Sequence, residues 1–495
     1  MRFNMRTEVA IIGAGVVGTT IARELSRYEV DVTVVEREVD VAFGSPTKAN
    51  SGIVHAGYDD EPGTARAKHC SRGNELWHKV APEVGAPFKE TGSLVVAFTE
   101  GEVEILWELR RRGEKNGVPG LEVVDDEALL RRIEPRLSDK VIAALRAPTA
   151  AVTSPYELAI AMMENAMKNG AKALFGAEVR GITVRDGGVG ELQTSRGDVE
   201  VTYVINAGGL RADEISAMVG LDCFTIRPRR GEYYVLDKKQ GEVTRHVVFP
   251  TPSQISKGIV VAPTVEGNVL MGPNAQDIDD KEDTATTATG LREAFEGAVK
   301  LFPMLADGKR FVIANFSGLR PEPNTKDFVI GSSDEVRGFV NAAGMRSPGL
   351  TAAPSVALEI VGLLRGLGLA LRPRLDFNPF RKPMDRPMRE MARCEAQALI
   401  QRNRRYGHVV CRCEHVTEGE ILDAVQRGAS TIDGIKFRTR AGMGRCQGGF
   451  CTPHVLRILA SQLKIPVEEV TKKGGGSAVL TCRVKEMLRR GGLDG

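Results

Sequence analysis

The chain of 495 residues contains no run of 18 or more apolar residues, which excludes a helix that spans a bilayer. Residues Met1 to Arg6 lack the apolar stretch of a signal peptide, so we expect a cytoplasmic protein with at most peripheral membrane association. The formal net charge is only +3, from 67 basic and 64 acidic residues. This surplus is too small to predict nucleic acid as a partner.

Cysteine is scarce, with eight residues in the chain, which argues against a disulfide framework and fits a reducing compartment. Four of the eight nevertheless form two close pairs near the C-terminus, with the spacing C-x-C, then 32 residues, then C-x4-C. Thiolates are soft ligands that prefer iron–sulfur clusters, zinc or copper. The sequence therefore predicts a metal site, either an iron–sulfur cluster or structural zinc, held by Cys411, Cys413, Cys446 and Cys451.

Residues 8–37 read as a strand, a glycine turn, a helix and a second strand. In the motif G-x-G-x-x-G, Gly13 makes the tight turn, Gly15 lets the backbone approach a pyrophosphate, and Gly18 permits close packing of helix on strand. Glu36 ends the second strand, where a carboxylate can bind a ribose hydroxyl. The segment predicts a dinucleotide site.

Two more apolar strands, at 204–209 and 338–344, also end in small residues that let a ligand approach the backbone. Three such strand ends suit an enclosed FAD better than a diffusible nicotinamide. Residues 349–353 then lead into an apolar helix through Leu364, whose N-terminal amides can face the flavin. The alternative for this helix start is close helix packing alone.

The predicted fold class is α/β, with a Rossmann-like FAD-binding domain interleaved with an antiparallel-sheet substrate domain (α+β) and a small helical C-terminal iron–sulfur domain. Short β-rich runs over 226–275 predict the antiparallel sheet, and helices are expected at 101–117, 157–168 and 285–302. Four prolines over 372–387 predict a linker before a polar helix at 388–404. The predicted bounds are 1–85, 145–225 and 325–371 for the FAD-binding domain, 86–144 and 226–324 for the substrate domain, 372–404 for the linker and helix, and 405–495 for the cluster domain.

Several segments resemble the D-amino-acid-oxidase-like flavoproteins, especially FAD-dependent glycerol-3-phosphate dehydrogenases and L-2-hydroxyglutarate dehydrogenases. These segments are the glycine motif, 50–57, 206–208, 317–321 and 344–351. Residues 411–414 and 438–451 resemble the bacterioferritin-associated-ferredoxin-like module of anaerobic glycerol-3-phosphate dehydrogenase, where four cysteines hold a 2Fe-2S cluster. After His55-Ala56-Gly57, however, the stretch 58–63 is closer to the hydroxyglutarate type.

The resemblance implies FAD and a 2Fe-2S cluster as cofactors. It also implies a set of FAD contacts drawn from the glycine motif, the second strand and the later strand ends. These residues are Gly13, Gly15, Gly18, Glu36, Arg37, Ser51, Gly52, Val179, Ala207, Gly208, Gly344, Gly349, Leu350 and Thr351.

Oxidation of an alcohol at a flavin needs a clamp for the substrate anion and a group that removes the hydroxyl proton. The resemblance places Arg320 in the clamp, because arginine binds phosphate or carboxylate through two parallel hydrogen bonds, and Arg346 is a second anion contact. His55 is either the base or a contact to the flavin ring, and a structural role stays open. Tyr58 and Tyr233 are expected to line the pocket, with core packing as the alternative.

The resemblance thus implies an FAD-dependent dehydrogenase that oxidises sn-glycerol 3-phosphate, a small anionic substrate, to dihydroxyacetone phosphate. Electrons would pass through the 2Fe-2S cluster to a partner redox subunit, which would be another flavin or NAD oxidoreductase or an electron carrier. Between Arg372 and Arg405 ten basic residues stand against four acidic ones, a surplus of six. The segment is either a solvated linker or a surface that helps to dock an acidic partner. The alternatives are a dehydrogenase of L-2-hydroxyglutarate or another 2-hydroxy or amino acid, and a non-catalytic electron-transfer or zinc-stabilised scaffold subunit.

Overall fold

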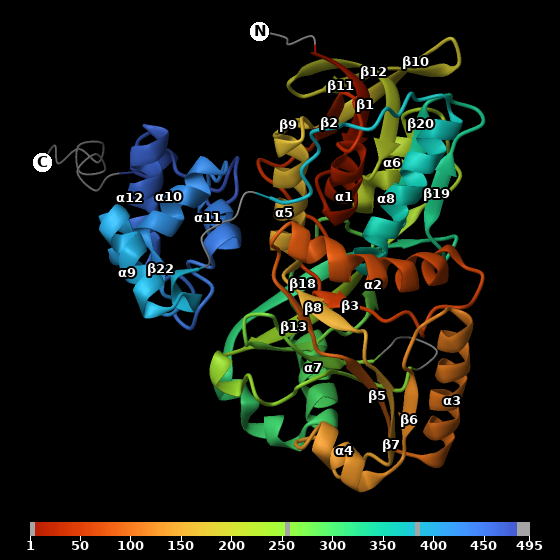
Figure 1. Cartoon of the computed structure of the whole chain (residues 1–495), viewed down its shortest axis with the longest axis vertical. Coiled ribbons are helices and arrows are strands. Elements are labelled where there is room, and N and C mark those ends of the chain that lie inside the picture. Colours follow the sequence, from red (N-terminus) through yellow and green to blue (C-terminus); the bar gives the residue numbers. More distant parts are fainter. Residues whose placement is uncertain (1–4, 253–257, 382–386, 483–495) are drawn as a thin grey trace, which may run out of the picture. The chain divides into compact units, whose positions relative to one another are not determined.

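The computed structural model describes residues 5–252, 258–381 and 387–482 of the chain (Figure 1). The described residues separate into two compact units. The larger unit takes in 5–37 and 44–381, and the C-terminal unit takes in 387–482 together with the short segment 38–43. Pro383 of the predicted linker and the last residues of the predicted cluster domain lie outside the described residues. The division of the larger unit into FAD-binding and substrate domains stays a prediction.

The first sheet of the larger unit has a parallel centre with the order β9-β2-β1-β12-β20. β12 also pairs with β11 in an antiparallel hairpin that continues to β10, and β19 lies antiparallel to β20. The strands are β1 (Met5–Ile12), β2 (Val32–Val35), β9 (Lys172–Leu174), β10 (Val179–Arg185), β11 (Gly188–Thr194), β12 (Gly197–Asn206), β19 (Val329–Ser332) and β20 (Phe339–Ala343).

Helices beside this sheet bury nearly continuous apolar faces, as parallel sheets require. α1 contacts both α5 and α8, and α8 also packs against α2 (Figure 1). The βαβ unit and the apolar helix predicted after the third strand end are confirmed. The helices are α1 (Val16–Leu25), α2 (Ala65–Glu83), α5 (Pro155–Lys168), α6 (Ala212–Ala217) and α8 (Gly349–Gly366).

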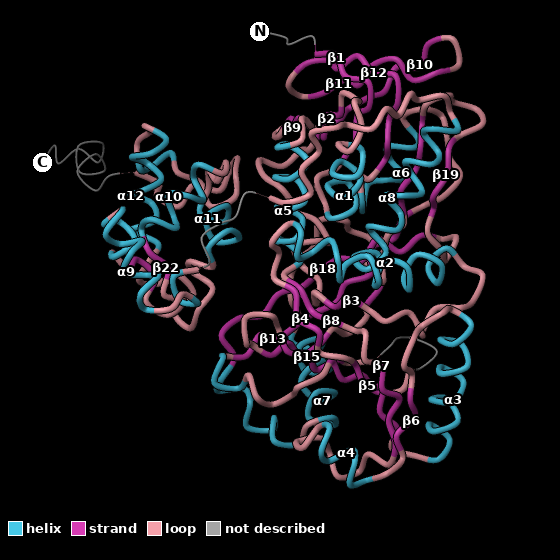
Figure 2. The backbone as a smooth tube through the Cα atoms, viewed as in Figure 1, coloured by secondary structure: helices cyan, strands magenta, loops and turns pink. Residues whose placement is uncertain are grey.

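The second sheet has the order β17-β13-β16-β15-β14-β5-β7-β6, and β18 also pairs with β13. Figure 2 shows its strands in the part of the molecule that carries the labels β13, β5 and β6. The β-rich runs predicted over 226–275 are confirmed as strands. These strands pair antiparallel with one another as predicted, and the sheet departs from the antiparallel pattern only where β14 runs parallel to β5, among the described strands. The strands are β5 (Ser93–Ala97), β6 (Glu122–Val124), β7 (Ala143–Ala147), β13 (Ile226–Leu236), β14 (Val247–Pro250), β15 (Val260–Pro263), β16 (Val269–Gly272), β17 (Gln276–Asp277) and β18 (Val312–Pro323).

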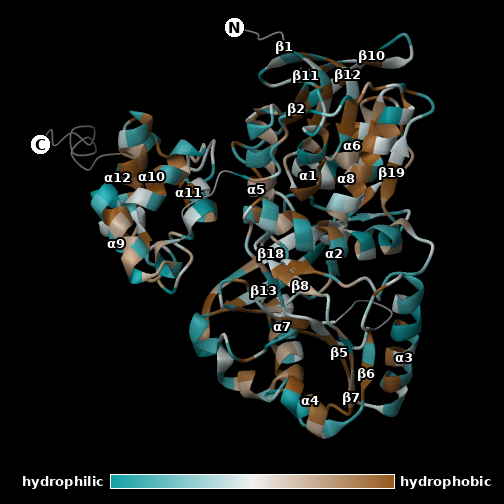
Figure 3. Ribbon diagram, viewed as in Figure 1, coloured by the Kyte–Doolittle hydropathy of each residue, from teal (hydrophilic) through white to brown (hydrophobic). Residues whose placement is uncertain are grey.

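Three helices accompany the second sheet: α3 (Glu100–Lys115), α4 (Glu127–Ile133) and α7 (Ala288–Leu301). Each begins at a side-chain cap, from Thr99, Asp126 and Thr287 respectively, which fixes the start of the helix. Hydrophobic residues gather along β5 (Figure 3), whose five residues are all buried. A small third sheet joins β3 (Ile53–Val54), β8 (Ala151–Thr153) and β4 (Phe88–Glu90).

The C-terminal unit is helical around a two-stranded sheet and has its own apolar core. The polar helix predicted over 388–404 is shorter than expected: α9 covers Arg393–Arg402 and is flanked by 3₁₀ turns at Met388–Glu390 and Arg404–Gly407. The other elements are β21 (Val409–Cys411), β22 (Val416–Thr417), α10 (Glu418–Gln426), α11 (Ile432–Thr439) and α12 (Thr452–Leu463).

The segment 38–43 follows β2 in sequence but packs with the C-terminal helices. Both oxygens of Asp40 accept hydrogen bonds from the Arg438 guanidinium, at 2.6 and 2.7 Å, and both side chains are 4% exposed. The Phe43 ring meets the edge of Phe437 with 5.4 Å between centroids. Removal of either partner of such a buried bidentate pair would leave the other charge buried without a partner, which strongly destabilises the folded state. The pair therefore fixes the position of the segment 38–43.

Within the residues that the structure describes, no helix combines the length and the apolar character needed to cross a membrane.

Candidate active site and metal centre

The glycine motif forms the turn between β1 and α1. Gly13 has a φ of +107°, in the left-handed region that favours glycine, and a side chain there would lie 2.5 Å from the Ala207 carbonyl oxygen. A Cβ at Gly18 would overlap the carbonyl oxygen of Gly13, so its absence lets α1 lie against β1. Gly15 precedes α1 and contributes no side-chain cap. The turn therefore offers bare backbone at a helix N-terminus, which suits a pyrophosphate.

Two oxygen atoms contact the amides of this turn. The Glu36 carboxylate accepts a hydrogen bond from the Ala14 N–H at 2.7 Å, and the Thr47 hydroxyl accepts one from the Val16 N–H at 2.9 Å. Thr47 was not predicted, because 31 residues separate it from Val16 and no local pattern connects them. Arg37 forms an exposed ion pair with Glu282 at 3.1 Å.

The three predicted strand ends lie side by side. Ile12 is in register with Asn206 and Asn206 with Asn341, so β1, β12 and β20 end at the same edge of the sheet. Ligands of open α/β sheets bind at this carboxyl edge. This edge brings together the predicted FAD contacts Gly13, Ala207, Gly208 and Gly344. The predicted contact Val179 begins β10, and Ala177 two residues before it donates its N–H to the Glu36 carbonyl at 2.8 Å.

Gly18→Ala is expected to yield protein with little or no FAD, because the added methyl group would displace α1 from the turn. The measurement is the ratio of flavin to protein after purification, with circular dichroism as the check on folding. Gly362→Ala is the matched control, since it changes an exposed glycine of α8 that has nothing within 4 Å of a new Cβ. Equal flavin content in both variants would contradict this role for Gly18.

His55 lies just after β3 and near the start of α8. Its Nε2 is 3.3 Å from the Ser347 hydroxyl, and its backbone N–H donates to the Thr351 hydroxyl at 2.9 Å. The predicted contacts Gly349, Leu350 and Thr351 form the first turn of α8, and Pro348 before them makes no side-chain cap. The structure therefore brings His55 to a helix start whose amides suit the flavin.

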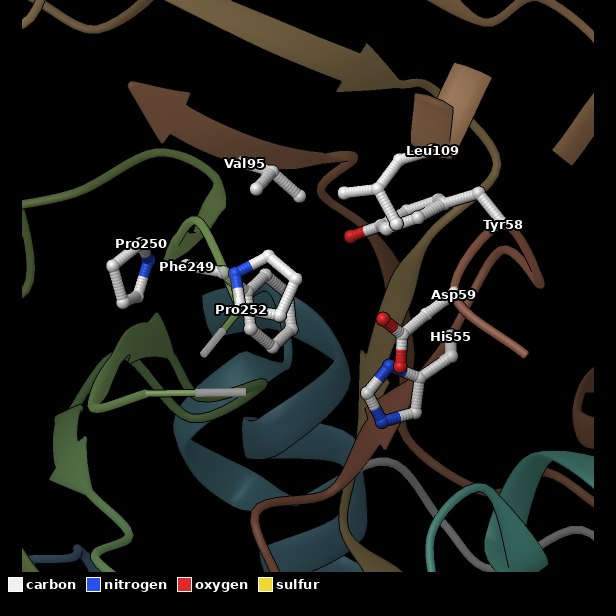
Figure 4. A pocket seen from close by; sticks show the side chains of 8 residues that line it. All are labelled: His55, Tyr58, Asp59, Val95, Leu109, Phe249, Pro250 and Pro252. Carbon is white, nitrogen blue, oxygen red and sulfur yellow. The ribbon is translucent and has the colours of Figure 1, made fainter. Parts of the chain in front are cut away.

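A pocket beside His55 is lined on one side by Tyr58, Asp59 and Leu109 and on the other by Phe249 and two prolines (Figure 4). Tyr58 is buried, at 6% exposure, and also belongs to an apolar cluster with Leu109. The structure thus joins His55 and Tyr58 in one pocket, whose lining includes neither Arg320 nor Arg346. Tyr58 serves both the pocket and the core.

Arg320 lies on β18, which pairs with β13. Gly231 on β13 leaves room for the Arg320 guanidinium, because a Cβ at position 231 would lie 2.3 Å from the Arg320 Nη2 atom. Its Nη2 donates to the Asn274 carbonyl at 2.7 Å, and it also hydrogen-bonds the buried Tyr233 hydroxyl. Tyr233 is hydrogen-bonded to Ser51 as well. Burial raises the pKa of Tyr233 and outweighs the opposing effect of Arg320, so the phenol stays neutral.

Arg346 forms an ion pair with Glu322 at 2.9 Å. Glu322 stands two residues after Arg320 on β18, and burial raises its pKa although arginines at 229, 66 and 320 oppose the rise. Arg346 is thus ion-paired with a carboxylate whose pKa the charge of Arg320 also lowers. Glu322 and Gly231 were not predicted, because their roles depend on side chains that meet them from other elements.

The predicted contacts Ser51 and Gly52 lie in the turn before β3. Gly52 has a φ of +68°, and its N–H donates to the Asn50 side chain at 2.7 Å. The hydrogen bond between Ser51 and Tyr233 connects this turn to Arg320. Together, the glycine turn, the aligned strand ends and the start of α8 fit a long, enclosed dinucleotide that ends near His55.

The four predicted cysteines meet in the C-terminal unit. The Sγ atoms of Cys411 and Cys413 are 3.9 Å apart, those of Cys413 and Cys446 are 3.7 Å apart, and Cys451 is hydrogen-bonded to Cys411. That last bond is the main cause that lowers the pKa of Cys411 to about 5. The sulfur contacts run from Cys451 through Cys411 and Cys413 to Cys446, so four thiols lie together, the number of cysteines that holds a 2Fe-2S cluster.

The turns that carry the cysteines are supported by a buried ion pair. Glu414, 2% exposed and next to Cys413, accepts a hydrogen bond from Arg440 at 3.0 Å. Gly444 lies against Cys413, and a Cβ there would come within 2.5 Å of the Cys413 sulfur. The Cys446 sulfur accepts hydrogen bonds from the backbone N–H groups of Phe450 and Gly448, and the first of these is the main cause that lowers the pKa of Cys446. Amide donors of this kind favour the thiolate form that binds iron.

Comparison with known protein families gives two matches. Residues 8–363 match the model of the family described as FAD dependent oxidoreductase. Residues 409–461 match the BFD-like [2Fe-2S] binding domain, and this range contains all four predicted cysteine ligands.

Individual proteins also match. The chain is 42% identical to a glycerol 3-phosphate dehydrogenase of Caloramator mitchellensis, over 97% of the chain and 100% of that protein. It is 26% identical to the anaerobic glycerol-3-phosphate dehydrogenase subunit A1 of Haloferax volcanii, over 92% of the chain and 83% of the relative. Among solved structures, FAD-bound L-alpha-glycerophosphate oxidase from Mycoplasma pneumoniae matches 77% of the chain and 100% of its own length, with a TM-score of 0.72 and 31% identity.

Proposed function

Because the chain belongs to the FAD dependent oxidoreductase family and ends in a BFD-like [2Fe-2S] domain, we propose that it oxidises sn-glycerol 3-phosphate to dihydroxyacetone phosphate. The observation that carries the substrate proposal is the 42% sequence identity to the glycerol 3-phosphate dehydrogenase of Caloramator mitchellensis, which extends over 97% of the chain and so over both units. The predicted enzyme class and cofactors are confirmed: the chain is an FAD-dependent oxidoreductase whose cofactors are FAD and a 2Fe-2S cluster.

Arg320 would bind the substrate phosphate. Its guanidinium lies over Gly231 and is held by the Asn274 carbonyl and the Tyr233 hydroxyl, so its orientation is set before substrate arrives. An arginine oriented in this way pays little entropy on binding and presents parallel donors to phosphate. Arg346 is a second phosphate contact in this proposal, and its ion pair with Glu322 sets its position.

His55 would accept the proton of the substrate hydroxyl at Nε2, the atom that contacts Ser347. FAD held by the glycine turn and the start of α8 would supply the acceptor for the hydride from the carbon that bears this hydroxyl. Loss of a hydride and a proton converts the secondary alcohol to the ketone, so the two electrons of the oxidation leave with the hydride. The start of α8 positions His55 through the hydrogen bond from the His55 N–H to Thr351.

The four cysteines of the C-terminal unit would hold the cluster, which supplies one-electron chemistry when bound. Cys411 and Cys451 are buried, whereas Cys413 and Cys446 are partly exposed. We extend the proposal to a partner redox protein that receives the electrons from the cluster. It is supported by the name of the Haloferax volcanii relative, which describes that protein as one subunit of a dehydrogenase.

The test is anaerobic titration of the purified protein with sn-glycerol 3-phosphate while the visible absorbance of the flavin is recorded. We expect complete bleaching at low substrate concentration. L-2-Hydroxyglutarate and glycerol are the comparison compounds, because the first offers carboxylates in place of phosphate and the second offers no anion. Faster bleaching by L-2-hydroxyglutarate than by glycerol 3-phosphate would contradict the proposed substrate.

A further inference from the structure

The two partly exposed cysteines, Cys413 and Cys446, mark the side of the cysteine site that faces solvent. Their sulfurs are 3.7 Å apart, and each is preceded in sequence by an exposed arginine, Arg412 and Arg445. Electron transfer between proteins requires close approach to a redox centre, so an exit from the cluster lies where its ligands are least covered. The surface around these two cysteines is therefore the place to look for a partner.

An exposed aromatic ring lies beside the same sulfurs. Phe450 is 77% exposed although its backbone N–H is hydrogen-bonded to the Cys446 sulfur. His454 and Arg457 stand three residues apart in α12 and therefore share one face of that helix, which begins two residues after Phe450, and both are exposed. Aromatic residues, phenylalanine among them, are enriched in protein interfaces relative to the rest of the surface.

The charge around this ring has one sign. Residues 445–457 contain two arginines and no aspartate or glutamate. Glu414, the acidic residue of 411–415, is buried and bonded to Arg440. Among the described residues neither Arg412 nor Arg457 forms an ion pair, so both charges are available to a partner.

We propose that Arg412, Phe450, His454 and Arg457 form the docking surface for an acidic one-electron carrier protein, whose negative patch surrounds its own redox centre. The cationic rim steers the carrier, and Phe450 inserts at the centre of the contact. This inference rests on the proposed function for the source of electrons. It places the partner at the cysteine site, in contrast to the basic segment 372–405 that composition alone favours.

The probe is a plant-type ferredoxin, which is acidic, with the basic protein cytochrome c as the opposite-charge control. Binding to the resting holoenzyme is measured by biolayer interferometry at several salt concentrations. Phe450→Ser is expected to weaken ferredoxin binding about tenfold. Arg412→Ala/Arg457→Ala is expected to slow association severalfold, with the difference lost at high salt.

The matched control is Arg402→Ala/Arg404→Ala, which removes the same charge from exposed positions of the basic segment. It is expected to leave ferredoxin binding unchanged. The paramagnetic signal of the reduced cluster is recorded for every variant as the check that the C-terminal unit is folded. If the variant that contains Arg412→Ala lacks this signal, the double variant Arg457→Ala/Phe450→Ser is used in its place to test the docking surface.

Equal effects of the two double variants would overturn the proposal, since charge would then act without regard to position. So would unchanged ferredoxin binding together with slower reduction of the cluster by the flavin, because the surface would then serve contact within this chain. Binding is measured without substrate, whereas flavin bleaching by glycerol 3-phosphate tests the proposed function, so each can fail alone.

Discussion

Arg320→Ala is expected to lower kcat/KM for glycerol 3-phosphate by roughly 30- to 5,000-fold, because a buried charged contact to a ligand anion contributes on the order of 2–5 kcal/mol. FAD content is expected to stay unchanged, since Arg320 contacts Tyr233 on β13 and Asn274 in the loop between β16 and β17, both in the second sheet's part of the chain. Steady-state kinetics and the flavin-to-protein ratio are the measurements. Arg320→Lys is expected to give a kcat/KM between those of Arg320→Ala and the unaltered enzyme, because lysine keeps the positive charge but lacks the paired N–H donors of arginine.

Arg227→Ala is the control for that series. Arg227 lies on β13, the strand paired with the β18 strand of Arg320, but its side chain is 61% exposed and pairs with Asp279 at 3.0 Å. We expect its kinetics to match the unaltered enzyme. If Arg320→Ala and Arg227→Ala behave alike, Arg320 does not bind the substrate anion.

Cys446→Ser is expected to remove the paramagnetic signal that the reduced cluster gives and to abolish electron transfer to a one-electron carrier. Glycerol 3-phosphate should still bleach the flavin, because Cys446 belongs to the C-terminal unit and the flavin site to the larger unit. Iron analysis, electron paramagnetic resonance and anaerobic titration give the three readouts. Loss of a cluster ligand removes a covalent contact, so the effect should be all or none.

The control is Cys223→Ser, which changes an exposed free cysteine of the larger unit. It should leave iron content and carrier reduction unchanged. Carrier reduction that persists in Cys446→Ser after the cluster signal is gone would show that electrons leave the flavin directly. Stoichiometric zinc in place of iron in anaerobically prepared protein would remove the electron path through the cysteines.

The sequence predicted best where a short motif and its chemistry lie in adjacent residues. Gly13 and Gly18 have local reasons to be glycine, and the structure shows both at the turn where they were expected. The small residues at three distant strand ends were also predicted, and the structure aligns these ends because parallel strands of one sheet share their carboxyl edge. The cysteine set followed from spacing together with the preference of thiolates for soft metals.

Features that depend on contacts between distant segments could not be predicted. Thr47, Gly231 and Glu322 have no local signature, and each gains its role from a side chain or backbone group on another element. The parallel pairing of β14 with β5 has the same origin, since β-rich runs do not specify their neighbour. The helix expected over 388–404 ends early because Asn403 leaves the helical conformation, with a ψ of +105°.

The position of residues 38–43 limits how the iron–sulfur domain can be transplanted. The Mycoplasma pneumoniae oxidase matches 77% of this chain over its whole length, so it is a natural recipient for a grafted C-terminal domain. A graft cut only near residue 382 would leave Arg438 buried without Asp40 and Phe437 without Phe43. The portable unit is therefore discontinuous: a working chimera needs six residues from the loop after β2 as well as the C-terminal segment.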